Sequence, residues 1–204
     1  MPEPEPDHSV PRNYVPLDPR SLRGLAHPLR MRLLSSLRHD GSATASQLAE
    51  RLGESSGATS YHLRQLAAHG FVEDDPGRGK GRERWWKASV DRTRFNDSLL
   101  TDPDPAVRGA ADLFMHEVAT IHTQEVGTWL GTAREWPEEW RRSSDLSDWT
   151  LRLTSAQASE LNEKVHELIE SYRDVKPAEG GGPETEAKTA QVRMHLHAFP
   201  RSTD

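Results

Sequence analysis

Cysteine is absent from the 204 residues of this chain. Without a thiol there is no disulfide, no thiolate metal site and no cysteine nucleophile. No run of about 18 apolar residues occurs, so the sequence predicts no transmembrane helix and no membrane partner. Residues 1–6 carry neither a basic segment nor an apolar run, and so do not look like a signal peptide. These absences favour a soluble cytoplasmic protein.

Hydrophobic and aromatic residues are scarce, at 34% and 6%, whereas charged residues make up 28% of the chain. This composition suits small cores with a large solvated surface rather than one large enzyme core. The sequence holds no nucleophile elbow, no phosphate-cradling loop that opens a helix and no convincing metal triad. We therefore expect a protein that is not an enzyme and that uses no cofactor.

The net charge of −6 is distributed unevenly along the chain. Residues 1–18 hold one basic residue against four acidic ones, residues 19–94 hold 14 against 8, and residues 95–204 hold 11 against 20. A basic segment joined to an acidic one is typical of a nucleic-acid reader with an appended acidic domain. Chance clustering of solvated charge is the alternative.

Helical periodicity begins after a proline-rich start. Residues 1–17 contain five prolines and few apolar residues, which predicts a disordered tail. Apolar residues then recur at helical spacing over residues 19–40. Pro28 interrupts that helix, which predicts either a kink or a short turn before the helix proper.

Two short helices follow, over about residues 45–52 and 56–69. Gly53 and Gly70 stand where each helix is expected to end. Two short helices around a tight glycine-containing turn predict a helix-turn-helix unit.

The second of these helices has the side chains of a recognition helix on its outer face. At 100° per residue, Thr59, Leu63 and Leu66 share the core side together with His62. The outward set, our candidate DNA-contacting residues, is Ser56, Gly57, Ser60, Tyr61 and Arg64. Small residues allow close approach to the major groove, hydroxyls reach phosphates or base edges, and arginine forks onto guanine. An ordinary polar helix face is the alternative.

A basic hairpin follows the helix-turn-helix unit. Two strand-like runs, residues 71–75 and 82–88, flank a glycine-rich loop. Its candidate phosphate-contacting cations are Arg78, Lys80, Arg82 and Arg84, which alternate with glycine or Glu83. Each cation is suited to neutralise one phosphate, so the hairpin predicts a wing and double-stranded DNA as the partner. A solvated turn is the less favoured alternative.

At this point the sequence resembles a known family. Residues 60–66 followed by 70–72 are similar to the S-x-H-L-x-x-L…G-L-V signature of ArsR/SmtB-type winged helix regulators, and residues 25–34 resemble that family's first-helix run. The resemblance implies a bacterial homodimeric DNA binder, usually a repressor, whose affinity a signal alters. Residues 44–48 offer no thiolate where many members carry a Cys-x-Cys box, so the effector is an unidentified small molecule or absent.

A long helix is predicted over residues 105–133. Its apolar residues step by four and three, and we expect this seam to pack on a helix of the same chain or of a second copy. The predicted dimerisation residues are those of the seam, namely Val107, Ala111, Phe114, Val118 and Ile121. A strand at 150–153, a helix opened by a Thr154–Gln157 capping box and a strand at 191–199 predict a small β-α-β unit.

The predicted fold is therefore α+β: a winged helix-turn-helix domain at 18–95 and a dimerisation or sensing domain at 96–204. The predicted function is a transcription regulator that binds a palindromic operator as a homodimer. Two alternatives stay open, namely a winged helix used as a protein-interaction module and a histidine-based metal-responsive regulator.

Three side-chain clusters are candidates for a metal or ligand site. Asp112, His116, His122 and Glu125, and separately His195 and His197, loosely imitate metal ligands, but solvated or core histidines are favoured. Trp129, Trp136, Trp140 and Trp149 suit a ligand pocket or, as favoured, a core. We therefore predict no metal site.

Overall fold

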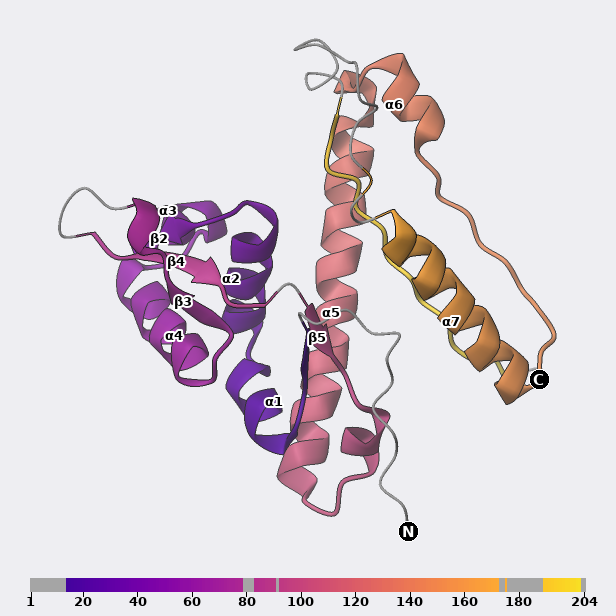
Figure 1. Cartoon of the computed structure of the whole chain (residues 1–204), viewed down its shortest axis with the longest axis horizontal. Coiled ribbons are helices and arrows are strands. Elements are labelled where there is room, and N and C mark those ends of the chain that lie inside the picture. Colours follow the sequence, from indigo (N-terminus) through magenta and orange to yellow (C-terminus); the bar gives the residue numbers. More distant parts are fainter. Residues whose placement is uncertain (1–13, 79–82, 91, 173–174, 176–188, 203–204) are drawn as a thin grey trace. The chain divides into compact units, whose positions relative to one another are not determined.

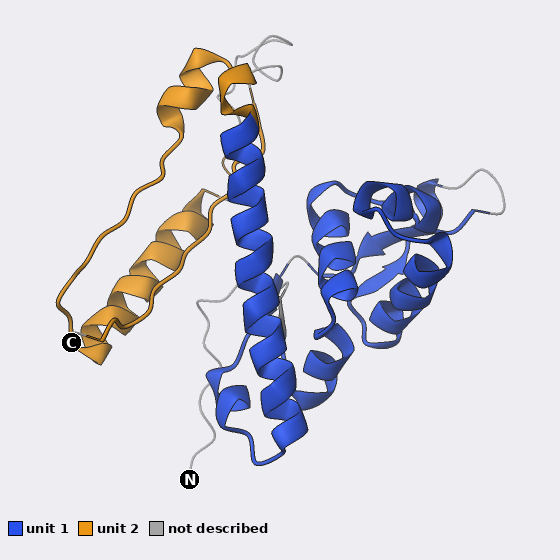
Figure 2. Ribbon diagram, turned by 180° about the vertical axis from the view of Figure 1, so that it is seen from behind, with its two compact units in different colours: residues 1–131 blue, residues 132–204 orange. Residues whose placement is uncertain are grey.

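The computed structural model describes residues 14–78, 83–90, 92–172, 175 and 189–202 (Figure 1). The chain divides into two compact units, residues 1–131 (unit 1) and 132–204 (unit 2), which are coloured separately in Figure 2. The elements of unit 1 are β1 (Tyr14–Pro16), α1 (Pro19–Leu25), α2 (Pro28–His39), β2 (Ala43–Thr44), α3 (Ala45–Leu52), α4 (Ser56–Ala68), β3 (Val72–Asp74), η1 (Pro76–Arg78), β4 (Trp85–Ala88), β5 (Arg92–Arg94), η2 (Asp97–Thr101) and α5 (Pro105–Thr132).

The first helical region is two helices, as Pro28 predicted. α1 ends at Leu25, and α2 begins at Pro28, whose missing N–H costs nothing in a first turn. His27 is the N-cap of α2, because its Nδ1 accepts a hydrogen bond from the Leu29 N–H at 3.2 Å. The interruption is therefore a short turn and not a kink.

α3 and α4 form the predicted helix-turn-helix unit. Thr44 and Gln47 make a reciprocal capping box at the start of α3. Gly53 closes α3 with φ +67°, and Gly70 follows α4 with φ +75°, both in the left-handed region that glycine adopts without strain. Ser55 caps α4 by accepting from the Ala58 N–H at 3.2 Å. The turn chemistry read from the sequence is thus confirmed.

A three-stranded antiparallel sheet in the order β2-β4-β3 completes the winged helix fold. The register pairs Val72 with Ala88 and Asp74 with Trp86, which confirms the predicted hairpin. β2 adds on the other side of β4 through Ala43 and Thr44. That strand is two residues long, too short for its alternation to be read from the sequence.

The N-terminal tail prediction is wrong for residues 14–17. β1 pairs in parallel with β5, and the Leu17 N–H donates to the Arg94 carbonyl at 2.9 Å. Leu17 is only 2% exposed. The physical reason is that a short extended run needs only an open strand edge and one buried side chain, and proline content does not forbid either. Residues 1–13 lie outside the described residues.

The first half of α5 belongs to the core of unit 1. Val107, Ala111 and Phe114 are 1%, 0% and 7% exposed, and Val118 and Ile121 pack against the same cluster. This corrects the dimerisation role predicted for the first three, because their surface is already covered within one chain. The unit boundary at 131 differs from the expected boundary at 95 for the same reason.

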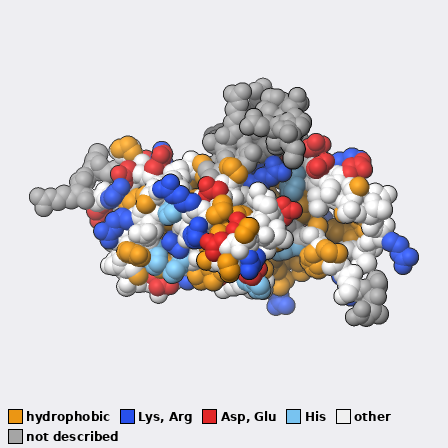
Figure 3. All heavy atoms as spheres, turned by 90° about the horizontal axis from the view of Figure 1, so that it is seen from below, with side chains coloured by type: hydrophobic (Ala, Val, Ile, Leu, Met, Phe, Trp, Pro, Cys, Tyr) orange, Lys and Arg blue, Asp and Glu red, His pale blue; other side chains and the backbone are white. Residues whose placement is uncertain are grey.

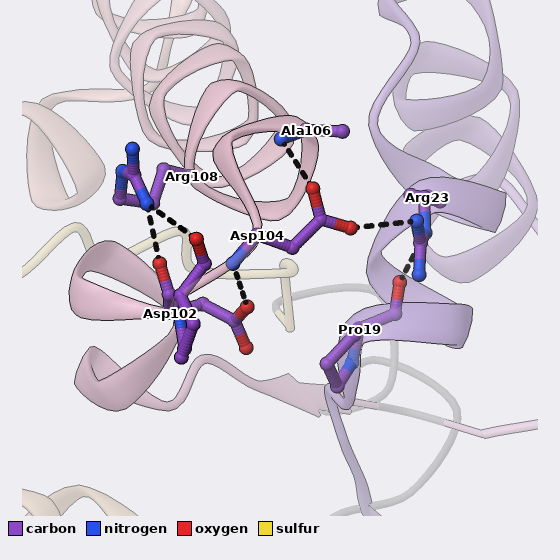
Figure 4. A network of polar contacts seen from close by, with 7 residues as sticks. Pro19, Arg23, Asp102, Asp104, Ala106 and Arg108 are labelled. Atoms are coloured by element: carbon purple, nitrogen blue, oxygen red, sulfur yellow. Dashed lines mark hydrogen bonds and ion pairs between the residues drawn. The ribbon is translucent and has the colours of Figure 1, made fainter.

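A polar network fastens the start of α5 to α1 (Figure 4). Asp104 caps α5 by accepting from the Ala106 N–H at 2.8 Å, and its second oxygen lies 3.4 Å from an Arg23 guanidinium nitrogen. Arg108 donates to the Asp102 carbonyl at 2.6 Å. The Arg23–Asp104 contact joins α1 to the start of α5, and the Arg108 contact closes the turn before α5.

Unit 2 contains η3 (Ala133–Glu135), α6 (Glu138–Ser143) and α7 (Ser155–Ser171). The capping box of Thr154 and Gln157 opens α7 as predicted. The strands predicted at 150–153 and 191–199 are wrong, since both segments run without β pairing. Alternation describes which face a side chain takes, but a strand also needs a partner's backbone donors and acceptors. The helices of the described ranges include none apolar and long enough to cross a bilayer.

Candidate nucleic-acid interface

α4 has one buried face and one exposed face, as the sequence predicts. Thr59, Leu63 and Leu66 are fully buried. On the opposite side Ser56, Gly57, Tyr61 and Arg64 are exposed, and Ser60 is half-buried. Tyr61 alone leaves 54% of its surface open. The outer face of α4 is therefore open to solvent along its length, as a helix that enters a DNA groove must be.

A shallow depression of about 390 Å³ joins that face to the wing. It is lined by Thr44, Ala45, Ser46, Ser60, Arg64, Glu83, Arg84 and Trp86. Ser46 lies in the first turn of α3, where backbone N–H groups have no partner within the helix and favour an anion. Sequence reasoning missed Ser46, and the Thr44–Gln47 capping box at the start of α3 is the signal that could have indicated it.

The wing cations are not equivalent. Two of the three guanidinium nitrogens of Arg84 donate to the Asp74 carboxylate, Nε to Oδ1 and Nη2 to Oδ2, the second at 3.0 Å. The same guanidinium lies 4.0 Å from the centroid of the Trp86 ring, a cation–π distance. Arg84 is thus already engaged within the hairpin, whereas Arg78 sits at its tip in η1. Lys80 and Arg82 lie outside the described residues.

Acidic residues surround the base of the wing. Glu73 pairs with Lys87 at 3.1 Å, across the β3–β4 register. Asp75 accepts a 2.6 Å hydrogen bond from the Ser42 hydroxyl, and that bond lowers the pKa of the Asp75 carboxyl. Figure 3 likewise shows basic, acidic and hydrophobic side chains interspersed on one face of the molecule. In the described part of the wing, carboxylates therefore pair with Arg84 and Lys87.

Behind the outer face of α4, two histidines lock it against α2. The His27 and His62 rings are 4.3 Å apart between centroids. Burial lowers the pKa of each imidazole, and the nearby Arg30 guanidinium lowers both further. The edge of Tyr61 meets the His62 ring at 5.1 Å between centroids. The lowered pKa favours the neutral form of both imidazoles, and the exposed Tyr61 packs on one of them, His62.

Of the other candidate clusters, Trp136 and Trp140 meet edge to face with ring centroids 6.4 Å apart, and the His195 and His197 rings are 6.5 Å apart. The His116 Nδ1–H donates to the Asp112 carbonyl at 2.8 Å, a contact within one helix. Across the described ranges, no three histidine or carboxylate side chains gather as metal ligands. The core role favoured for the tryptophans is wrong for Trp136 and Trp149, which are 40% and 76% exposed, because no residue that the structure describes in unit 2 is buried.

Residues 25–75, which span α2, α3, α4 and β3, match a family model described as a helix-turn-helix domain. The matched segment contains the helix-turn-helix unit that α3 and α4 form. The match supports a DNA-binding transcription regulator and does not resolve the ArsR/SmtB subtype.

No curated protein matches the chain. Among solved structures, a mutant of ZitR from Lactococcus lactis is 14% identical, with 72% of this chain and 74% of that chain covered and a TM-score of 0.28. The apo form of the ZitR mutant is 15% identical, with 76% and 91% covered and a TM-score of 0.29. Similarity at this level supports no conclusion about the present chain.

Proposed function

We propose that the chain is a bacterial, cytoplasmic transcription regulator that binds a palindromic operator as a homodimer and represses transcription without catalysing a reaction. One observation carries the proposal. The exposed face of α4, which lies in the segment that matches a helix-turn-helix domain, meets the wing across a shallow depression.

In this proposal α4 enters the major groove from its N-terminal end. Ser56 and Gly57 are small and exposed there, so the backbone is able to approach the base edges closely. Arg64 lies two turns further along and is long enough to fork onto a guanine. Tyr61 and Ser60 supply hydroxyls to phosphates or bases. The chain is thereby matched to one half-site, and a second copy reads the other.

The wing supplies affinity rather than sequence preference in this proposal. Arg78, Lys80 and Arg82 each neutralise one phosphate and release its counterion. Arg84 orders the hairpin through Asp74 and Trp86 and reaches DNA only by leaving the carboxylate. An unidentified small molecule is the proposed signal, because the cysteine-free chain has no thiolate switch.

The test is operator selection from a random DNA pool, followed by titrations with two variants. Arg64→Ala is expected to relax sequence preference at one base pair of each half-site, worth about 1–3 kcal/mol. The triple variant Arg78→Ala, Lys80→Ala, Arg82→Ala is expected to weaken binding to every sequence and to reduce the salt slope by about three.

Arg142→Ala on α6 is the matched control, since it removes an exposed arginine that pairs only with Glu138 among its described contacts. Unchanged DNA affinity and salt dependence in both test variants would overturn the proposal. A selected consensus without two-fold symmetry would overturn its dimeric part.

A further inference from the structure

The described residues of unit 2 expose many large apolar side chains. None of its described residues is buried. Its exposed large apolar side chains are Trp136, Leu146, Trp149, Leu151, Leu153, Leu161, Leu168, Tyr172, Val175, Val192, Met194, Leu196 and Phe199. An exposed apolar surface of this extent marks a site of association.

The most regular part of that surface is a stripe along α7. Leu161, Val165, Leu168 and Tyr172 step by four, three and four residues, which places them on one side of the helix. Leu161, Leu168 and Tyr172 are 40%, 61% and 70% exposed, and Val165 is half-buried between them. The spacing is that of the a and d positions of a helix pair, so another helix fits this stripe best.

The charges of α7 leave the stripe open to an identical helix. With Val165 and Tyr172 at a positions, the positions flanking the stripe hold Asn162, Lys164, Ile169 and Ser171. The four carboxylates, Glu160, Glu163, Glu167 and Glu170, fall at the c and f positions, away from the contact. Lys164 already pairs with Glu160 of the same helix. Two copies therefore meet without opposing carboxylates.

α5 does not offer an equivalent stripe. The first three residues of its predicted seam are buried in the core of unit 1. Its exposed large apolar side chains are Leu113, Met115 and Leu130, and no two of these are three or four residues apart. Val118 and Ile121 of the same seam are half-buried and pack against that core, so we place the pairing that the proposed palindromic operator requires on another surface.

We propose that the α7 stripe, Leu161, Val165, Leu168 and Tyr172, pairs with the same stripe of a second copy of this chain. The inference rests on the proposed function for its choice of partner, because one α4 reads one half-site and a two-fold operator needs two chains. A two-fold axis sets any stripe against itself, so a self-complementary apolar stripe satisfies both copies at once.

The test measures the oligomeric state of the full chain by sedimentation equilibrium in the absence of DNA. Leu168→Glu buries a carboxylate in the contact and is expected to raise the dimer dissociation constant by about tenfold or more. His166→Glu places the same side chain at an exposed b position of α7 and is expected to change the constant less than about twofold. Leu168 is mostly exposed within one chain, so its replacement leaves the fold intact, which thermal melting checks.

Because the chain has no cysteine, disulfide trapping provides an independent measurement. Oxidised Val165→Cys, Leu168→Cys or the double variant is expected to form a covalent dimer, whereas His166→Cys is not. The two single variants cross-link if the helices are parallel, and the double variant does so if they are antiparallel.

Unchanged dimerisation of Leu168→Glu, a wild-type chain that stays monomeric, or no cross-link from any stripe cysteine would overturn the inference. If Leu168→Glu stays dimeric and still binds the operator, the α7 pairing fails and the proposed function stands. If wild type dimerises through α7 but binds no DNA, the proposed function fails and the pairing stands.

Discussion

At Gly24 the backbone of α1 lies against the imidazole of His69, which follows α4. A Cβ at this position would meet His69 Cγ at 2.3 Å, and ring atoms on both sides of it at less than 3 Å. Gly24→Ala is therefore expected to push α1 away from α4 and to lower the free energy of unfolding by about 1–3 kcal/mol. Thermal and urea melts measure the loss.

Gly109→Ala is the control for that substitution. Gly109 lies within α5, and no atom is within 4 Å of a Cβ built there. The added methyl group is expected to stabilise the helix by about 0.5–1 kcal/mol. If the two alanine variants melted alike, the close approach of Gly24 to His69 would contribute nothing to the free energy of unfolding.

The paired histidines make the stability of unit 1 depend on pH. The pKa of His27 and of His62 is lowered in the folded chain, from the ordinary value of 6.5. The unfolded chain therefore binds more protons than the folded chain as the pH falls below about 6.5, and the free energy of unfolding decreases. Above that pH both states are neutral, and this contribution to stability is fully present.

His62→Gln removes one of the two rings and is expected to flatten the fall in melting temperature between about pH 7.5 and pH 5.5. His116→Gln, at an exposed position of α5, serves as the comparison. An equal slope in wild type and His62→Gln would show that the pair does not govern the acid sensitivity. Arg30 and Glu54 act on the same rings from α2 and the turn before α4, so the salt concentration is held constant.

Among the elements, α5 contributes Val107, Ala111 and Phe114 to the core of unit 1. Phe114 stacks on Phe95 with centroids 5.5 Å apart and rings 5° from parallel. Phe114→Ala is expected to cost about 3–5 kcal/mol, because a cavity replaces a ring in the core. Leu113→Ala, one residue earlier and 42% exposed, is expected to cost less than about 0.5 kcal/mol. Denaturant melts of the two variants distinguish a core helix from an appended one.

Helices and turns were largely predictable from the sequence because their signals are local. The capping boxes at Thr44 and Thr154 and the glycines at 53 and 70 each fix a boundary through contacts only a few residues apart. Strand pairing is not local. β1 depends on an edge at β5, about 80 residues away, and so a proline-rich segment concealed a strand.

The candidate site was predictable to a similar degree. The outer face of α4 follows from helical geometry alone, and the structure orients it as expected. The sequence was not able to indicate that Arg84 pairs with Asp74, since this contact depends on the β3–β4 register. The same holds for the α5 seam, whose spacing is identical whether it faces its own core or a second chain.

On the scale of the whole molecule, the boundary between the units makes a prediction about fragments. A chain that ends at Gly131 keeps Val107, Ala111 and Phe114 in the core and is expected to melt cooperatively. A chain that ends at Phe95 exposes the apolar surface those residues cover and is expected not to fold. Circular dichroism melts of both fragments test this, and a cooperative transition in the shorter one would contradict the assigned core.

Trp86 belongs both to the core of unit 1 and to the candidate interface. Its ring is 3% exposed, lines the depression beside Ser60 and Arg64, and carries the Arg84 guanidinium on its face. A cation over an indole alters the light that the indole emits. A phosphate that draws Arg84 away would therefore change the fluorescence of Trp86, and the difference between wild type and Trp86→Phe isolates that signal from the other tryptophans. The chain thus carries its own optical reporter of wing engagement, with no label attached.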